Sequence, residues 1–567
     1  MARPRPHATT TLPEIWKLAW LGDADLSPEA LESGAPHSGA DFSERISVPG
    51  CFDTLPGHAG ARGTAALRTH FTTGSEPAGV LHFDGLGIWA AIYVDGTLLH
   101  VHRKPYSSFA VAVPARAGER ELVVLLDNRF DTARSPLQEN YFDFYAYGGI
   151  FRPVTYTALP AVHIERVAVT TVSLEPPTIE VTVMANEETG VELSFEIDGK
   201  AVAAVQPEGP TTVSTPRQLA PAGARPWSPD HPEMHELTVS LSVSGTTDRY
   251  RVSFGLRTVE TQDGQILLNN EPVRLFGWNR HEVHPQFGPA LPVAQMVQDL
   301  EIMKAAGANF VRGSHYPQDE RFLDLCDQMG VLVWEETLGW QQTERHFADQ
   351  EYQKLIGEQQ LEMIQAHINH PSIIMWGFQN ELASDKTAAR QVIENLATVC
   401  RTADPSRPVT FASCRFPNDV CLDLVDIISL NIYPGWYAAD DNAYRPLEEI
   451  ETRLDTIQEG LREQGLADRP LIISEIGAGA IYGWRDAHAG HWSEQYQSDY
   501  LAEVCTQFLA RADITGLALW QYCDGRTYGS SRALGRPRTF NNKGIVDEYR
   551  RPKDAYTAVQ ALMEDQI

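Results

Sequence analysis

The C-terminal half of the chain alternates between short apolar runs and longer stretches in which apolar residues recur with helical spacing. The apolar runs suit strands that are covered on both faces. Eight of them lie at 274–278, 309–313, 331–335, 372–378, 408–413, 426–431, 470–475 and 516–522. Helical patterns lie at 293–306, 319–329, 350–369, 385–403, 445–464, 492–511 and 552–565, whereas the link at 414–425 is short and has no clear one. This alternation predicts a (β/α)8 TIM barrel.

The N-terminal half has a different pattern, in which short β-rich runs are cut by Gly, Pro and Asp turns. Runs at 79–86, 89–96 and 121–128 are of this kind and predict a β-sandwich of the jelly-roll type. From about 163 to 258, four alternating runs predict a second, immunoglobulin-like β-sandwich. We therefore expect a multidomain protein: a sugar-binding-like jelly roll at 1–162, an immunoglobulin-like sandwich at 163–258 and a catalytic TIM barrel at 259–567.

Composition narrows the possible partners and the compartment. The formal charge of −29 argues against nucleic acid and against an anionic membrane as partners. The seven cysteines are scattered without CxxC spacing, which indicates reduced thiols. The first residues have no apolar signal-peptide core, and no run is long enough to span a membrane. We expect a cytoplasmic enzyme.

Two strand-like runs end in glutamates, Glu381 and Glu475, which lie 94 residues apart. In a TIM barrel the C-terminal strand ends share one mouth, where active sites form. Retaining glycoside hydrolysis uses two carboxyls at one site: one protonates the leaving oxygen, and the other attacks the sugar carbon. Other polar and aromatic candidates follow the strands: His281, His315, Asn380, Asn431, Tyr433 and Trp520. Such a ring predicts a site for a polar ligand that stacks on aromatic walls.

The whole chain resembles glycoside hydrolase family 2. The recurrent pieces are PWSPDHP at 226–232, GLRTVE at 255–260, NRHE at 279–282, SHYP at 314–317 and NHPSIIMWGFQNE at 369–381. The resemblance implies that Glu381 is the acid/base and Glu475 the nucleophile. It also implies that His281 and His315 hydrogen-bond sugar hydroxyls or order the carboxylates.

Four segments are similar to the β-glucuronidases of that family: DFYAYGGIFRPV at 143–154, LNIYPGWY at 430–437, HWSEQYQ at 491–497 and NNKGI at 541–545. The last fits an NxK motif whose Asn and Lys hold the sugar carboxylate. The implied substrate contacts are Asp143, Asn431, Tyr433, Tyr437, Asn541 and Lys543, together with an arginine, Arg538 or Arg536. Electrostatics favours this role for Lys543. A chain with a formal charge of −29 repels an anionic substrate, so such a substrate needs a local cation in the site.

The expected function is therefore that of a retaining, exo-acting β-glucuronidase that acts on a small-molecule or oligosaccharide β-uronide. WQYCDG at 520–525 departs from the glucuronidase pattern, so a β-galacturonidase is the first alternative and a neutral β-galactosidase the second. From another class, a carbohydrate-binding pseudoenzyme is disfavoured because binding needs no acid/base pair. We expect no cofactor and no metal, and the resemblance implies a homo-oligomer, either a dimer or a tetramer.

Overall fold

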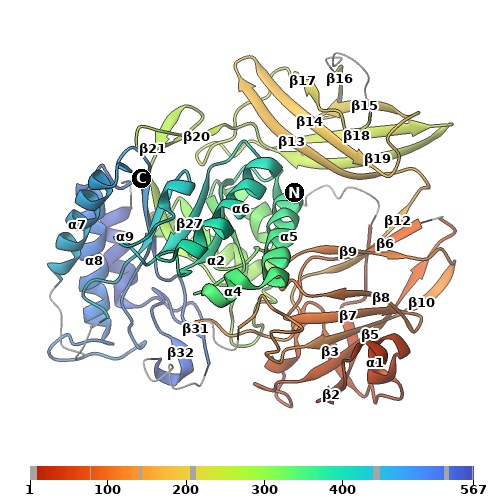
Figure 1. The fold of residues 1–567 in the computed structure, drawn as a ribbon, viewed down its shortest axis with the longest axis horizontal. Coiled ribbons are helices and arrows are strands. Elements are labelled where there is room, and N and C mark those ends of the chain that lie inside the picture. Colours follow the sequence, from red (N-terminus) through yellow and green to blue (C-terminus); the bar gives the residue numbers. More distant parts are fainter. Residues whose placement is uncertain are drawn as a thin grey trace.

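The computed structural model describes residues 9–76, 78–139, 143–204, 212–437, 447–528, 536–564 and 566. Figure 1 shows three bodies, two made mainly of strands and one in which strands and helices alternate; the first also carries the short helix α1 (Pro28–Ser33). The chain runs from the red and orange sandwich through the yellow one into the green and blue barrel. The predicted fold class, β-sandwiches followed by a (β/α)8 barrel, is confirmed.

The N-terminal sandwich packs a four-stranded sheet on a six-stranded one. Side chains alternate between buried and more exposed positions along strands such as Ala78–Phe83, so one face of each sheet builds the core. The four-stranded sheet has the order β1 (Thr9–Thr11), β12 (Val154–Leu159), β6 (Ala78–Phe83) and β9 (Phe109–Val113). The six-stranded sheet has the order β3 (Glu44–Ser47), β2 (Ile15–Gly22), β5 (Thr64–Thr73), β10 (Gly118–Asp127), β7 (Trp89–Val94) and β8 (Thr97–His102).

In the second sandwich, too, one face of each sheet builds a core, and its two sheets have fewer strands. Leu237, Val239 and Leu241 of β18 alternate with more exposed residues, which is the pattern of a strand covered on one face. One sheet has the order β13 (Ile164–Leu174), β14 (Pro177–Ala185) and β17 (Arg217–Leu219). The other has the order β16 (Lys200–Val202), β15 (Glu192–Ile197), β18 (His235–Val243) and β19 (Thr246–Phe254).

The barrel is closed by eight parallel strands, each overlapping one of the predicted apolar runs. Their residues are buried throughout because helices cover the outside of the barrel. The strands are β23 (Leu275–Asn279), β24 (Phe310–Gly313), β25 (Leu332–Thr337), β26 (Ile373–Asn380), β27 (Val409–Ser413), β28 (Ile428–Asn431), β29 (Leu471–Ile476) and β30 (Gly516–Leu519). A small sheet of β20 (Val259–Gln262), β21 (Gln265–Leu268) and β22 (Glu271–Val273), which the pattern did not predict, precedes them.

Except for the short helix Glu344–Ala348, which the pattern did not predict, the barrel helices begin and end close to the predicted bounds. Asp319 caps the first turn of α3 by accepting from the Arg321 N–H, and Gly330 (φ 68°) ends that helix. The helices are α2 (Val293–Ala305), α3 (Glu320–Met329), α4 (Glu344–Ala348), α5 (Gln350–His367), α6 (Thr387–Ala403), α7 (Glu449–Glu463), α8 (Glu494–Ala510) and α9 (Asp554–Met563). Between β27 and β28, where the sequence pattern indicates no clear helix, the chain forms only a short 3-10 turn, Leu422–Leu424. None of the helices in the described ranges combines the length and the apolar character that crossing a bilayer requires.

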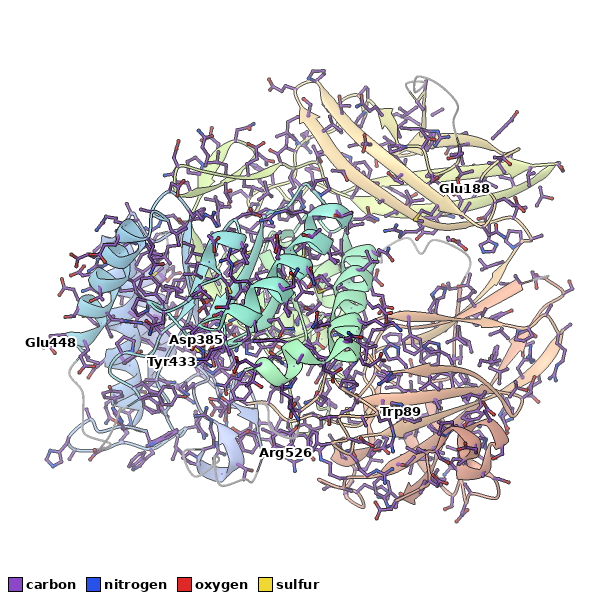
Figure 2. All side chains as sticks on the ribbon, in the orientation of Figure 1. Trp89, Glu188, Asp385, Tyr433, Glu448 and Arg526 are labelled. Carbon is purple, nitrogen blue, oxygen red and sulfur yellow. The ribbon has the colours of Figure 1, made fainter. Side chains whose placement is uncertain are left out.

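The N-terminal sandwich is fixed to the strand ends of the barrel by buried polar contacts. Arg152 donates to Oε2 of Glu282 at 3.1 Å and to the carbonyl of Pro317 at 2.6 Å. The Tyr145 N–H donates to the carbonyl of Arg526 at 3.0 Å. Figure 2 labels Arg526 where the two bodies meet. The segment around residue 143 is thereby held at the mouth of the barrel.

Candidate active site

Glu475 lies in β29, and Glu381 follows directly on β26. Tyr433, which follows β28, is labelled in Figure 2 and contacts Glu475. Glu381 has φ 54°, a left-handed conformation that a non-glycine residue rarely adopts. The chain therefore maintains a strained backbone at this carboxyl, which is typical of functional positions.

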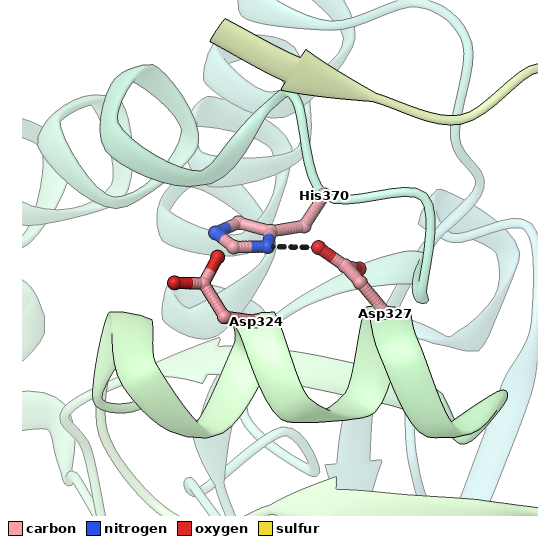
Figure 3. Close-up of side chains that lie close together, drawn as sticks. All are labelled: Asp324, Asp327 and His370. Atoms are coloured by element: carbon pink, nitrogen blue, oxygen red, sulfur yellow. Dashed lines mark hydrogen bonds and ion pairs between the residues drawn. The ribbon is translucent and has the colours of Figure 1, made fainter. Parts of the chain in front are cut away.

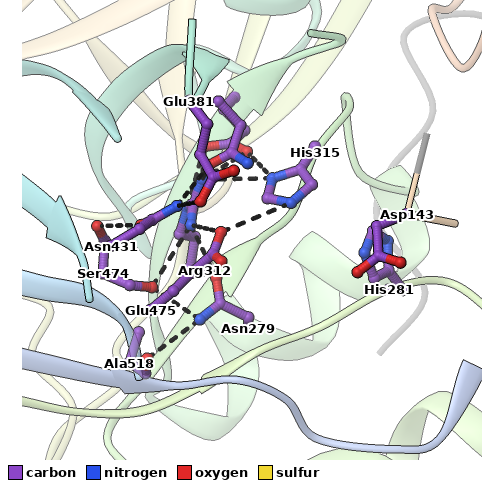
Figure 4. Close-up of polar contacts among 12 residues, drawn as sticks. Asp143, Asn279, His281, Arg312, His315, Glu381, Asn431, Ser474, Glu475 and Ala518 are labelled. Atoms are coloured by element: carbon purple, nitrogen blue, oxygen red, sulfur yellow. Dashed lines mark hydrogen bonds and ion pairs between the residues drawn. The ribbon is translucent and has the colours of Figure 1, made fainter. Parts of the chain in front are cut away.

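Each glutamate is held by donors that arrive from neighbouring strand ends (Figure 4). Asn431 donates to Oε1 of Glu381 at 3.1 Å, and Gln341 donates to its Oε2 at 3.0 Å. Arg312 donates to Oε1 of Glu475 at 3.0 Å, and the Tyr433 hydroxyl donates to its Oε2 at 2.7 Å. Both oxygens of both carboxyls are thus oriented before any substrate arrives.

The two carboxyls differ in their surroundings and influence each other. Burial first, and the charge of Glu381 second, raise the pKa of Glu475 to about 8, while Arg312 and Tyr433 act in the opposite direction. The ionisation of Glu475 is therefore linked to the charge of Glu381, because a negative charge on one carboxyl disfavours a second one beside it.

Arg312 is the central cation of the site, and it was not predicted as a site residue. It lies in β24 and is fully buried. Besides Glu475, it donates to both oxygens of Glu336, at 3.0 Å each, and to Oδ1 of Asn380 at 2.9 Å. An arginine inside an otherwise apolar strand run was the available signal, because a buried guanidinium requires buried acceptors. Gln341 was also missed, because it follows its strand by several residues.

His281, His315 and Trp520 form a wall beside the carboxyls. The ring of His315 stacks on Trp520, with centroids 5.2 Å apart, and its Nδ1 lies 2.6 Å from Oε1 of Glu336. Nδ1 of His281 lies 3.2 Å from the Tyr316 hydroxyl, whereas its buried Nε2 has no hydrogen-bond partner among the described residues. Burial is the main cause that lowers the pKa of both histidines well below the ordinary range, so both rings are neutral.

Lys543 and Asn541 lie at the same mouth, as the NxK pattern predicted. The ammonium group of Lys543 donates to the Tyr437 hydroxyl at 2.6 Å and lies 4.7–5.7 Å from the ring centroids of Tyr433, Trp436 and Tyr437. Burial and then Arg536 lower the pKa of Lys543 well below its ordinary value. In the described parts of the chain, no carboxylate lies within ion-pair distance of this ammonium group.

The two arginines before Asn541 point to different partners. Arg536 donates through Nε and Nη2 to the two oxygens of Asp143, at 3.0 and 2.6 Å. Arg538 donates to Glu548 at 2.9 Å and to Asn542 at 3.0 Å. The structure thus brings Arg536, and not Arg538, beside Asp143, and the predicted substrate contact of Arg538 stays a prediction that this geometry does not favour.

A small pocket joins the sandwich segment to these barrel residues. Its lining includes Asp143, Tyr145, His281, Gln521 and Asn541. The buried Oε1 of Gln521 and the hydroxyl of Tyr145 have no hydrogen-bond partner among the described residues. Buried polar groups of this kind indicate a place for water or for ligand hydroxyls.

Only one group of side chains in the described ranges has a geometry that could hold a metal ion, and it lies elsewhere (Figure 3). Asp324 and Asp327 belong to α3, and His370 precedes β26. Nδ1 of His370 lies 2.6 Å from Oδ2 of Asp327, whose other oxygen accepts from the Ser372 N–H at 3.1 Å. This group therefore lies at the opposite end of β26 from Glu381.

Known proteins match the chain over most of its length. Residues 162–257 match the model of glycosyl hydrolases family 2, and residues 259–566 match that of its TIM barrel domain. A β-glucuronidase of Chlorocebus aethiops is 31% identical over 74% of this chain, which spans 64% of that relative. A β-glucuronidase of Streptococcus agalactiae is 29% identical over 84% of this chain and 83% of its own length.

The solved structures that match include one with galacturonate bound. This is a GH2 β-galacturonidase of Eisenbergiella tayi, which is 34% identical and has a TM-score of 0.86. The match covers 99% of this chain and 97% of that one.

Proposed function

Because the chain belongs to glycosyl hydrolase family 2, whose members are glycosidases, we propose that it is a retaining, exo-acting β-uronidase that releases terminal β-D-glucuronic acid from β-glucuronides. The observation that carries this proposal is Lys543, a cation only 2% exposed that has no carboxylate partner among the described residues. A buried, unpaired ammonium is costly and is stabilised by a bound anion. The uronate carboxylate of a substrate would supply that anion.

The proposed chemistry uses the two glutamates in turn. Glu475 attacks the anomeric carbon while Glu381 gives its proton to the leaving oxygen, and the sugar remains as an ester on Glu475. Glu381 then takes a proton from water, whose oxygen attacks the same carbon and releases Glu475. The hydrogen bond from Arg312 to Oε1 of Glu475 and that from Tyr433 to Oε2 support the role of a nucleophile aimed before reaction.

The remaining site residues are proposed to recognise the sugar. Neutral histidines can both donate and accept, which suits His281 and His315 to hydroxyl groups. The indole of Trp520 offers an apolar face. Asn380 and Asn431 supply amide groups to the sugar site, and Asp143 supplies a carboxylate. A cytoplasmic location and a homo-oligomeric state stay expectations.

β-Galacturonides are the second candidate substrate. The relative with galacturonate bound is 34% identical over 99% of this chain, whereas the two β-glucuronidases are 29–31% identical over 74–84% of it. The two uronic acids differ only in the configuration at C4, so Lys543 suits both. The pocket lining that contains Gln521, where the chain departs from the glucuronidase pattern, supports keeping this candidate.

A kinetic comparison with one leaving group tests the proposal. p-Nitrophenyl β-D-glucuronide, β-D-galacturonide and β-D-galactoside are offered to the same enzyme, and kcat/KM is measured for each. We expect both uronides to exceed the galactoside, with the glucuronide first. A leading galacturonide would favour the second candidate, a leading galactoside would refute a uronidase, and binding without any hydrolysis would favour a carbohydrate-binding protein.

The coupling between the two glutamates predicts a pH dependence. Since the pKa of Glu475 is about 8 and the proposed hydrolysis needs one proton on the two carboxyls, kcat/KM should fall above this pH. In Glu381→Gln, assayed with a leaving group that needs no proton, this alkaline fall should disappear. Glu475 should also ionise at lower pH, because removal of the neighbouring negative charge favours its charged form.

The measurement is a pH–rate profile on a neutral β-glycoside, so that the charge of Lys543 is not required. Glu394→Gln, an exposed glutamate of α6, serves as the control. An alkaline limb that stays in place in Glu381→Gln would contradict the coupling.

A further inference from the structure

Three cations in the short stretch 536–543 have three different electrostatic situations. Arg536 is paired with Asp143, and Arg538 is paired with Glu548. Lys543 has no carboxylate partner in the described part of the chain and makes its hydrogen bond to the neutral Tyr437 hydroxyl. A carboxylate arriving in the site therefore meets one cation whose charge is not yet compensated.

We propose that Arg536 is a positioning residue: it forms one neutral pair with Asp143, holds that carboxylate toward the sugar hydroxyls, and leaves the substrate carboxylate to Lys543. This inference rests on the proposed uronidase function and deepens it. It assigns the preference for an anionic substrate to Lys543 and not to Arg536.

The geometry of the pair supports a holding role. Nε and Nη2 of Arg536 contact the two different oxygens of Asp143, which is the bidentate arrangement in which arginine binds carboxylates most strongly. Both side chains are only 11–12% exposed, so solvent weakens the pair little. An arginine engaged in this way must give up an existing charge-assisted pair before it can bind a second carboxylate.

The hydrogen bonds of Asp143 leave room for a ligand. A carboxylate has about four lone-pair sites. Two accept from Arg536, and a third, on Oδ2, accepts from Asn541 at 2.9 Å. Counting only partners among the described residues, about one site on Oδ1 remains, and the same pocket lining contains His281, whose Nε2 also lacks a partner there. A sugar hydroxyl could donate to Asp143 and meet His281 without disturbing the pair.

The pair also adds a side-chain contact to the backbone contact by which Tyr145 holds this segment near the barrel. Asp143 belongs to the segment between β10 and β12 of the N-terminal sandwich, and Arg536 lies 393 residues later, beyond the last barrel strand. Arg536 thus acts on the substrate through Asp143. Its loss should affect recognition of any sugar that uses this carboxylate, whether or not the sugar is charged.

Three variants test the inference: Arg536→Gln, Asp143→Asn and the double variant, compared by the ratio of kcat/KM on a uronide and on its neutral counterpart with the same leaving group. Arg536→Gln leaves Asp143 unpaired and should lower the ratio about 10-fold, because a lone carboxylate repels the uronate. Asp143→Asn should raise it. The double variant removes a neutral pair, so its ratio should return to within about 3-fold of wild type while kcat/KM falls about 10–100-fold on both substrates.

A double variant that still loses the uronide selectively would overturn the inference, because Arg536 would then contact the substrate carboxylate itself. An Arg536→Gln variant with unchanged kinetics would overturn it as well. Arg536→Lys gives a second measure if a glutamine variant unfolds: it should keep the ratio near wild type but lower kcat/KM on both substrates, since a point charge does not hold two oxygens. Failure of the proposed function has a different signature, namely a Lys543→Met variant with no selective loss on uronides.

Discussion

Glu475→Ala is expected to lower kcat for uronide hydrolysis by at least about 10⁴-fold, because in the proposed mechanism Glu475 forms the covalent intermediate. Arg312 would keep its hydrogen bonds to Glu336 but lose the one to Glu475, and the Tyr433 hydroxyl would lose its acceptor. Steady-state rates on a p-nitrophenyl uronide measure this loss. Glu394→Ala, an exposed glutamate on α6, should stay within about 2-fold of wild type.

Added azide identifies which glutamate has which role. In Glu475→Ala, azide takes the place of the missing nucleophile and should give the α-glycosyl azide. In Glu381→Ala, supplied with an activated leaving group, azide should instead attack the ester on Glu475 and give the β-glycosyl azide. Proton NMR of the products distinguishes the two anomers, and exchanged outcomes would reverse the assigned roles.

Lys543→Met is expected to lower kcat/KM for a uronide by about 10²–10³-fold and to change the value for the matched neutral glycoside little. The charge-assisted contact with the uronate, made in a site walled by aromatic rings, should contribute about 2–4 kcal/mol. The neutral sugar has no carboxylate to lose. It could even gain, because methionine removes a buried cation whose hydrogen-bond acceptor among the described residues is the Tyr437 hydroxyl.

The control is Lys354→Met, a lysine of α5 whose side chain is 63% exposed. It should leave both kcat/KM values unchanged. Equal losses on charged and neutral substrates in Lys543→Met would mean that the lysine only supports the fold of its loop, and the uronidase proposal would fail.

The barrel could be predicted from the sequence because each strand is buried on both faces and so appears as an unbroken apolar run. The place of the two glutamates at the barrel mouth could be predicted for the same reason, since Glu475 ends such a run and Glu381 follows another by three residues. Arg312 was missed because inside β24 it looked like a strand residue, although its guanidinium binds Glu336, Asn380 and Glu475. Only the closed barrel brings these acceptors, from three other strands, around one side chain.

The choice between Arg536 and Arg538 could not be made from sequence spacing. The two residues lie in an irregular segment, where side-chain direction depends on local backbone angles. Arg538 and Thr539 have φ of 62° and 61°, so the chain turns sharply between the two arginines and Asn541. Periodicity gives no information on such turns, and the ionic partners were needed to distinguish the arginines.

The contacts between the N-terminal sandwich and the barrel have a consequence for how this chain can be divided or recombined. Arg152 and Asp143 come from the sandwich, yet their charges are balanced by Glu282 and Arg536 of the barrel part. A barrel expressed alone would leave Glu282 and Arg536 facing water without their counter-ions and would lack one wall of the sugar pocket. The smallest part of this chain that can be expressed with a complete site is therefore larger than the barrel. Exchanging N-terminal sandwiches between relatives would also exchange part of the substrate specificity.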